Sequence, residues 1–226
     1  MTPPIAVIAL GIAVPVGIIG AYVLAERRRR EALQQYSEQR GYRFDPKRPD
    51  AEIELAEAFP IFRKGHGHDW GCTITGQIGG TPFTAFDYLY VTGGGKNSQR
   101  HRIAMMLWET PGASLPRFSL GPEGFWRRIA QRFGAQDFDF EGDEAFSRGY
   151  ELQGDDEAAV RALFTPARRA FLVAMGPDEK VQRHHLAGAG TRLLWWRLGR
   201  LPKPDDLDQF LADGDRVRRL FMEGAR

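Results

Sequence analysis

The chain has 226 residues, with 31 Lys and Arg, 29 Asp and Glu, one cysteine, 12% aromatic residues and a pI near 8.8. This composition excludes a disordered tail, which has few aromatic residues, and a disulfide-rich secreted scaffold, which needs paired cysteines. Without Glu26 and the four arginines 27–30, the charge is 27 basic against 28 acidic residues, which argues against a nucleic-acid-binding domain with its own basic face.

The first predicted element is a membrane-spanning helix over residues 5–25, a run of 21 residues without a charge. At about 1.5 Å per residue the run is roughly 31 Å long, which matches the hydrocarbon core of a bilayer. Glu26 and then Arg27, Arg28, Arg29 and Arg30 follow it, while no Lys or Arg precedes it. The positive-inside rule therefore predicts a short N-terminus outside, the bulk of the chain in the cytoplasm and the arginines at the lipid surface. The alternative is a signal peptide cleaved after Ala25, but its basic residues would precede the apolar run.

Small residues recur every four positions along this predicted helix, at Ala9, Ala13, Gly17 and Ala21. Such a row lies on one helix face and lets two helices approach closely, which predicts a homodimer. The alternative is a chance row, because alanine and glycine are common in membrane helices.

The charged segment after the arginines is predicted to continue as a helix over residues 31–39. Leu33 and Tyr36 are its only large apolar residues. This pattern is typical of a stalk rather than of a core element. Residues 41–50, with two prolines, indicate a linker. The predicted organisation is an anchor over 1–30, a juxtamembrane helix and linker over 31–50, and a cytoplasmic domain over 51–226, either single or divided into halves 51–140 and 141–226.

The soluble part is predicted to be an α+β domain with an antiparallel sheet of five to seven strands and helices on one face. Alternating residues at 72–78 and 83–91 flank Gly79-Gly80, which predicts a hairpin with a tight turn, and a strand over 102–109 follows. Further strands are expected through Phe146, Tyr150 and Leu152, and as a hairpin over 181–186 and 192–198. Helices are expected over 125–133, after the acidic residues 155–157, from Pro166 and from Pro204.

Asp87 is the only charge in the predicted strand 83–91, where both faces carry large apolar residues. A carboxylate in such a setting must find a hydrogen-bond donor or bind a proton, so Asp87 is either a structural acceptor or part of a functional site.

Three other patterns raise ligand sites. Lys96 follows three glycines, but the order of residues is not that of a phosphate-binding loop, and a strand rather than a helix comes next. His66 and His68 carry metal-binding groups near Asp69 and Cys72, without the spacing of a known zinc site. The acids at 137–141 resemble half of a calcium loop whose last position is Arg148. We therefore expect no metal, cofactor or catalytic residue, and retain Asp87, His66, His68 and Lys96 as the candidates for a ligand site.

Four phrases, FDYLYVTGGGK, LPRFSLGPEGF, FSRGYELQGDD and VRALFTP, resemble a family of uncharacterised bacterial proteins with an N-terminal membrane anchor and a domain of unknown function. The resemblance covers residues 55–222. It implies a single-pass protein of the bacterial inner membrane with a cytoplasmic α+β domain, and it carries no catalytic residue to this chain.

The predicted function is that of a binding or scaffold module held at the membrane, with the bilayer and an unidentified protein as partners. A lipid- or envelope-stress sensor is the first alternative, and a hydrolase-type enzyme that uses Asp87 with the histidines is the second. An enzyme is the least favoured of the three, because no nucleophile–base pair stands out.

Overall fold

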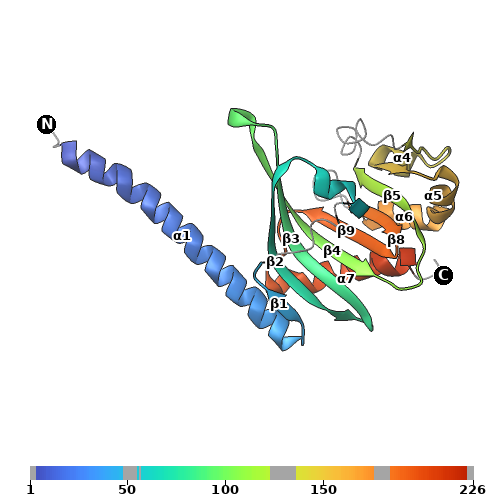
Figure 1. Cartoon of the computed structure of the whole chain (residues 1–226), viewed down its shortest axis with the longest axis horizontal. Helices are drawn as coiled ribbons and strands as arrows, with labels where there is room; N and C mark the ends of the chain where they lie inside the picture. Colours follow the sequence, from blue (N-terminus) through green and yellow to red (C-terminus); the bar gives the residue numbers. More distant parts are fainter. Residues whose placement is uncertain (1–3, 48–54, 56, 123–135, 176–183, 223–226) are drawn as a thin grey trace.

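The computed structural model describes residues 4–47, 55, 57–122, 136–175 and 184–222, with the backbone alone at 4–16 and 136–137. These residues form an α+β structure in which nine antiparallel strands make one sheet with packed helices (Figure 1). The strand order is β1-β2-β3-β4-β9-β8-β5-β7-β6. The bounds are β1 Arg43–Asp45, β2 His66–Ile78, β3 Thr81–Thr92, β4 Gln99–Glu109, β5 Leu115–Pro122, β6 Gln136–Asp137, β7 Tyr150–Gly154, β8 His185–Gly190 and β9 Arg192–Leu198.

The sheet confirms the predicted α+β class with an antiparallel sheet and packed helices, and it has more strands than the five to seven expected. The extra strands include β1 and β6, which have three and two residues and are too short to show alternation in the sequence. Pairing between β4 and β9 joins the two predicted halves of the domain within this sheet. The division of residues 51–226 into one domain or two stays a prediction.

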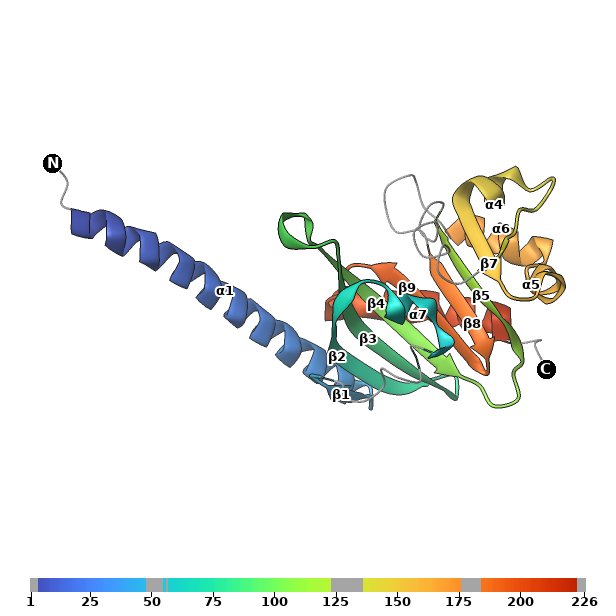
Figure 2. The ribbon, with the colours of Figure 1, turned by 45° about the horizontal axis from the view of Figure 1, so that its top comes forward.

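The N-terminal helix α1, Pro4–Gln39, is 36 residues long and projects away from the sheet (Figures 1 and 2). Among the residues that the structure describes, no helix has the length and apolar character needed to cross a membrane. Residues 5–16 of the predicted membrane span, including Ala9 and Ala13 of the small-residue row, lie outside the described side chains. In the part of α1 that follows, five large apolar side chains are exposed: Ile18, Ile19, Tyr22, Val23 and Leu24.

The C-terminal part of α1 is not a stalk, and that prediction was wrong. Leu33 and Tyr36 are buried in the main hydrophobic core. The Tyr36 hydroxyl donates a hydrogen bond of 2.7 Å to Asp208 of α7, Pro204–Met222, and the Arg40 guanidinium pairs with the same carboxylate. The Arg40 hydrogen bond, supported by Tyr36, holds the pKa of Asp208 below its usual range. Two apolar residues one helical turn apart are enough here, because the helix packs on a sheet and on a second helix.

The hairpin of β2 and β3 forms as predicted. Gly79 and Gly80 have φ of 59° and 79°, the positive values that such a two-residue turn requires. Tyr88 and its alternate neighbours Phe86 and Tyr90 share one face of β3, while Phe83 and Ala85 face the other.

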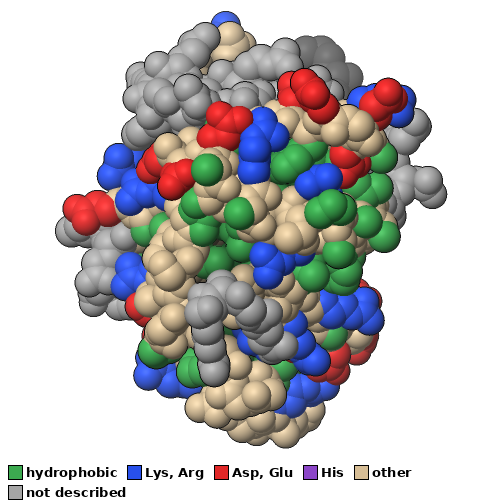
Figure 3. All heavy atoms as spheres, turned by 90° about the vertical axis from the view of Figure 1, so that its right-hand side faces the viewer, with side chains coloured by type: hydrophobic (Ala, Val, Ile, Leu, Met, Phe, Trp, Pro, Cys, Tyr) green, Lys and Arg blue, Asp and Glu red, His purple; other side chains and the backbone are tan. Residues whose placement is uncertain are grey.

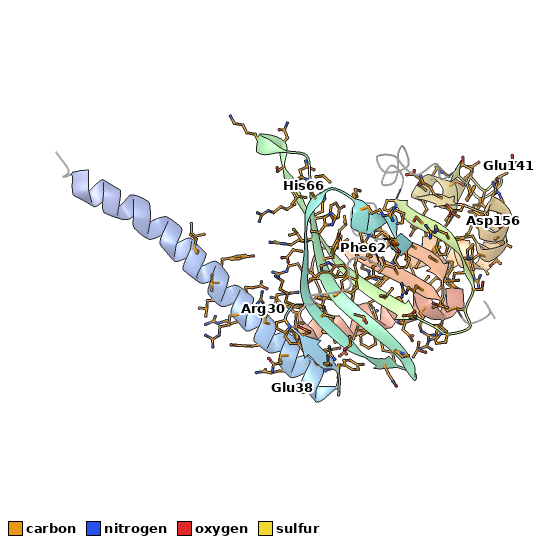
Figure 4. All side chains as sticks on the ribbon, viewed as in Figure 1. Arg30, Glu38, Phe62, His66, Glu141 and Asp156 are labelled. Atoms are coloured by element: carbon orange, nitrogen blue, oxygen red, sulfur yellow. The ribbon has the colours of Figure 1, made fainter. Side chains whose placement is uncertain are left out.

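Each face of the sheet has its own hydrophobic core. On the first face, α7 packs so closely that Gly214 approaches Met106, Trp108 and Trp195 of the sheet, where a Cβ atom would meet the Met106 sulfur at 2.5 Å. The second face is covered by the short 3-10 helix η1, Pro60–Arg63, whose Phe62 stacks on Trp70 with ring centres 5.1 Å apart (Figure 4).

Three helices complete the first core at the far end of the sheet: α4 Glu144–Gly149, α5 Glu157–Leu163 and α6 Pro166–Met175. The helix predicted to begin after the acidic residues 155–157 is α5. Its N-cap is Asp156, whose carboxylate accepts a hydrogen bond from the Ala159 amide. Phe146, expected in a strand, lies instead in α4, because the Asp143 carboxylate accepts from the Phe146 amide and starts a helix there. The final hairpin is formed by β8, which begins at His185, and β9. Residues 181–183 of the expected strand and the helix expected over 125–133 lie outside the described residues.

His184 is buried between a strand and a helix with both ring nitrogens engaged. Trp195 Nε1 donates to His184 Nδ1 at 3.0 Å, and His184 Nε2 lies 3.0 Å from the Met175 carbonyl. This pattern requires the neutral ring with its proton on Nε2, and burial lowers the pKa of His184.

We predict that the folded protein loses stability as the pH falls below about 6.5, the usual histidine pKa, because the unfolded chain binds a proton at His184 that the folded chain excludes. Urea unfolding at pH 7.5 and pH 5.5 measures the change. In His184→Asn, which cannot titrate, the unfolding free energy will be lower at pH 7.5 but will fall less between the two values. The exposed His66→Gln is the control and will keep the original pH dependence; equal slopes for all three proteins would contradict the prediction.

Candidate functional site

The charged residues between α1 and the sheet form a compact ion-pair network, which we call the junction cluster: Glu26, Arg29, Asp87 and Arg200. Arg29 Nη2 donates to Asp87 Oδ2 at 2.7 Å and to the Leu201 carbonyl at 3.1 Å. The other Asp87 oxygen accepts from the Leu201 amide at 2.6 Å. The Arg29 and Asp87 side chains are only 16% and 11% exposed, so the pair joins α1 to the strand and to the loop before α7 in a largely water-free setting.

Glu26 forms the outer half of the junction cluster. It accepts from Arg200 Nη2 at 2.8 Å and from Arg30 Nε at 3.4 Å. The Arg200 hydrogen bond is the main cause that holds the pKa of Glu26 below its usual range. Since a lowered carboxyl pKa stabilises the folded state only above the unfolded pKa, this contact weakens as the pH falls below about 4.5.

A glycine in β2 makes room for the buried carboxylate. The register of β2 against β3 shifts between Trp70 and Thr73, and Gly71 sits there beside Asp87. A Cβ atom at Gly71 would lie 2.8 Å from the Asp87 Cβ, closer than real Cβ contacts allow. Asp87 therefore fits at this point of β3 because residue 71, beside it on β2, is a glycine.

Cys72 lies against the same cluster, with its sulfur 3.6 Å from Arg29 Nη1. Burial raises the pKa of its thiol, which outweighs the opposite effect of Arg29. A thiol that resists ionisation is a poor nucleophile, and no histidine is among the hydrogen-bond partners that the described residues supply to it.

The predicted ligand residues do not form one site. Asp87 is a hydrogen-bond and ion-pair acceptor for the fold. His66 begins β2 (Figure 4) and pairs with Val91, four positions from Asp87 along β3. The His68 ring lies 5.8 Å from that of Tyr88. Lys96 lies in the 3-10 helix η2, Gly95–Asn97, at the tip of the β3–β4 hairpin. Within the described part of the chain, no three His, Cys, Asp or Glu side chains gather as a metal site would require.

The four consecutive arginines, residues 27–30, face different ways. Arg29 turns inward to Asp87, whereas Arg27 is 77% exposed and pairs with Glu31 one turn away. Arg28 is exposed and Arg30 is half exposed. Sequence reasoning missed Arg200 and the Leu201 backbone, which carry no local signal because they lie more than a hundred residues from their partners.

Two hollows flank the junction cluster. One of about 230 Å³ is lined by Tyr22, Glu26 and Arg30 of α1 together with Asp69, Leu89 and Arg102 of the sheet. The other, of about 620 Å³, lies between α1 and residues 200–205, and charged side chains such as Arg28 and Lys203 line it together with Ala25 and Pro204. The first hollow places residues 22–30 of α1 beside residues 69–72 of β2 and Arg102 of β4.

These features define a class: an antiparallel α+β domain to which a long N-terminal helix is fixed by buried ion pairs. Comparison with solved structures finds a fold likeness to the crystal structure of the mycobacterial trehalose monomycolate transport factor A, TtfA, with a TM-score of 0.55 and 12% sequence identity over 86% of this chain and 94% of that one. No family model matches the chain, and no curated protein matches it in sequence. The likeness to TtfA concerns the fold, and the resemblance to a bacterial anchored family stays a prediction.

We predict that Asp87→Ala lowers the unfolding free energy by about 2–3 kcal/mol, because it leaves Arg29 and the Leu201 amide without their buried acceptor. Urea denaturation of the variant measures the change. Asp87→Asn, which keeps an acceptor for the amide, will lose less, and the outer variant Arg30→Gln will change stability by less than about 0.5 kcal/mol. An unfolding free energy of Asp87→Ala equal to that of the original chain would show that the cluster does not hold α1.

We predict that Gly71→Ala destabilises the fold by about 1–3 kcal/mol, because the added methyl overlaps Asp87. The matched control is Gly94→Ala, where a Cβ atom meets nothing within 4 Å and the backbone is extended. Thermal unfolding of both variants compares them directly. Equal midpoints would contradict the close approach of Gly71 to Asp87.

Proposed function

We propose that this protein is a membrane-tethered accessory factor: residues 5–25 anchor it in the bacterial inner membrane, and its α+β domain binds a membrane-protein partner on the cytoplasmic side. It acts as a binding module rather than as an enzyme. The process that we assign to it is transport of an envelope lipid.

The observation that carries this proposal is the continuity of α1. One helix runs from exposed apolar residues such as Ile18 and Leu24, 65% and 48% exposed, to Leu33, which is fully buried. Exposed apolar side chains in a row are stabilised by lipid or by another apolar helix, not by water. Because Arg29 and Asp87 clamp the helix to the sheet, whatever surrounds residues 5–25 also fixes the position and orientation of the domain.

The charge pattern supports the orientation. The arginines 27–30 follow the apolar run directly, and the positive-inside rule places such a cluster in the cytoplasm. The fold supports the process: TtfA is, by its title, a transport factor for trehalose monomycolate, and this chain shares its topology over most of both lengths.

The chemistry of the described residues favours binding over catalysis. Asp87 is occupied by Arg29 and the Leu201 amide, and the Cys72 thiol is held neutral by burial. The candidate histidines lie at another level of the sheet. A hydrolase that uses Asp87 would therefore have to break the contact that attaches α1.

We predict that the full chain, solubilised from native membranes with a mild detergent, co-purifies with a second membrane protein in a fixed molar ratio. Mass spectrometry of the intact complex gives the partner and the ratio. Before solubilisation, the chain will stay in the membrane pellet during carbonate extraction, and a chain with Ile18→Lys, Ile19→Lys and Val23→Lys will be released from it.

The matched control carries Leu198→Lys, which alters a large exposed apolar residue outside α1 and will leave membrane retention unchanged. Recovery of the chain from the pellet as a monomer or homodimer, without another protein, would contradict the accessory role. A homodimer would instead support the small-residue row of α1 as a contact. Release of the unaltered chain by carbonate would contradict the anchor itself.

A further inference from the structure

The hairpin between β3 and β4 carries a concentration of positive charge that the junction cluster does not use. From residue 88 to residue 108 the sequence has no Asp or Glu, but it has Lys96, Arg100 and Arg102. All three side chains are exposed, and none of them makes an ion pair with another described residue. We call these three residues the basic hairpin.

The basic hairpin adjoins the start of β2, where Asp69 is the first acid. Residues 59–68 contain Arg63, Lys64 and two histidines, and His66 lies opposite Val91, which in turn lies opposite Arg100. The far end of the molecule differs. There, over α4 to α6, acidic and basic side chains are both present on the surface (Figure 3).

The fold sets the level of the basic hairpin relative to α1. Arg102 lines the same hollow as Tyr22 and Arg30, so the base of the hairpin lies beside the start of the arginine cluster. From Leu89, which also lines this hollow, β3 continues to Thr92 for roughly 10 Å before the turn. Figures 1 and 2 show that the hairpin extends beyond the sheet on the side toward which the N-terminal half of α1 runs.

This arrangement gives the hairpin a second contact with the membrane. If α1 leaves the bilayer near residue 25, as in the function proposed above, and crosses it at a tilt, the hairpin lies along the bilayer surface, with its base beside Tyr22 at the level of the lipid headgroups. We infer that the basic hairpin docks on the anionic phospholipid headgroups of the same membrane, with Lys96, Arg100 and Arg102 against their phosphates. Such a contact limits rotation of the domain about α1, so that the sheet faces its partner in one orientation.

A lipid surface fits the patch better than a nucleic acid does. The remainder of the chain after residue 30 is close to neutral, and three cations at one hairpin tip provide no extended basic face. Each lysine or arginine near an anionic membrane surface is attracted to it, and salt screens this attraction.

The experiment uses the full chain in bilayers of phosphatidylcholine, with or without phosphatidylglycerol, that contain a nitroxide-labelled headgroup as a quencher. A fluorophore is attached at Asn97→Cys in the hairpin or at Gln77→Cys, exposed near the opposite end of the same strands. The chain with buried Cys72 as its only thiol gives the background. We expect quenching at position 97 roughly twofold or more above that at position 77 when phosphatidylglycerol is present, and a loss of this difference at high salt.

The triple variant K96Q/R100Q/R102Q will lose the quenching at position 97. A triple variant with Arg117→Gln, Arg148→Gln and Arg216→Gln removes the same number of exposed cations elsewhere and will keep it. Equal quenching at positions 97 and 77 would overturn the inference, as would quenching that does not depend on phosphatidylglycerol. Quenching at position 97 that appears only when a membrane-protein partner is added would also overturn it.

Flotation of the same bilayers separates this inference from the proposed anchor. A chain that floats with the bilayers but shows no quenching at position 97 contradicts the hairpin contact alone. A chain that does not float contradicts the anchor, and with it the position of the hairpin at the headgroups.

Discussion

The contact between Arg29 and Asp87 determines how this molecule is assembled. It joins a helix that extends away from the protein to the middle of a sheet, and the Leu201 amide and carbonyl connect the same pair to the loop before α7. A largely buried ion pair adds little net stability by itself, but removal of one partner leaves a charge without compensation. The pair therefore acts mainly to specify a single position for α1, which Leu33 and Tyr36 then secure by burial in the core.

This constraint changes the meaning of the arginine cluster. Four consecutive arginines in sequence are a membrane-surface signal, yet a helix turns each residue by about 100°, so the four cannot share one environment. Arg29 is directed to the sheet, Arg27 pairs along the helix, and Arg28 and Arg30 remain at the surface. One stretch thus attaches the domain through Arg29 and, in the proposed function, also orients a membrane segment. The inferred contact of the β3–β4 hairpin would add a second, purely electrostatic point of support.

The likeness to TtfA is one of topology at 12% identity. At that distance side chains at a site are free to differ, so the likeness carries the fold while function rests on residues of this chain. This chain has an ion-paired attachment of α1, a nearly neutral domain with two cores, and exposed basic groups beside α1. The proposed function rests on these features.

The sequence by itself determined the features that depend on neighbouring residues. Gly79-Gly80 predicted the hairpin because a tight turn needs positive φ, and Asp156 predicted the start of α5 because a free amide lies three residues on. The apolar run before the arginines predicted a membrane-spanning helix; the helix α1 is present there, and the span itself stays a prediction. Only the tertiary structure decided the role of Asp87, whose partners lie 58 and 114 residues away. It also decided that Leu33 and Tyr36 are core and that β4 lies beside β9. The physical reason is that burial and ion pairing depend on which distant segments meet, and a local pattern of residues does not contain that information.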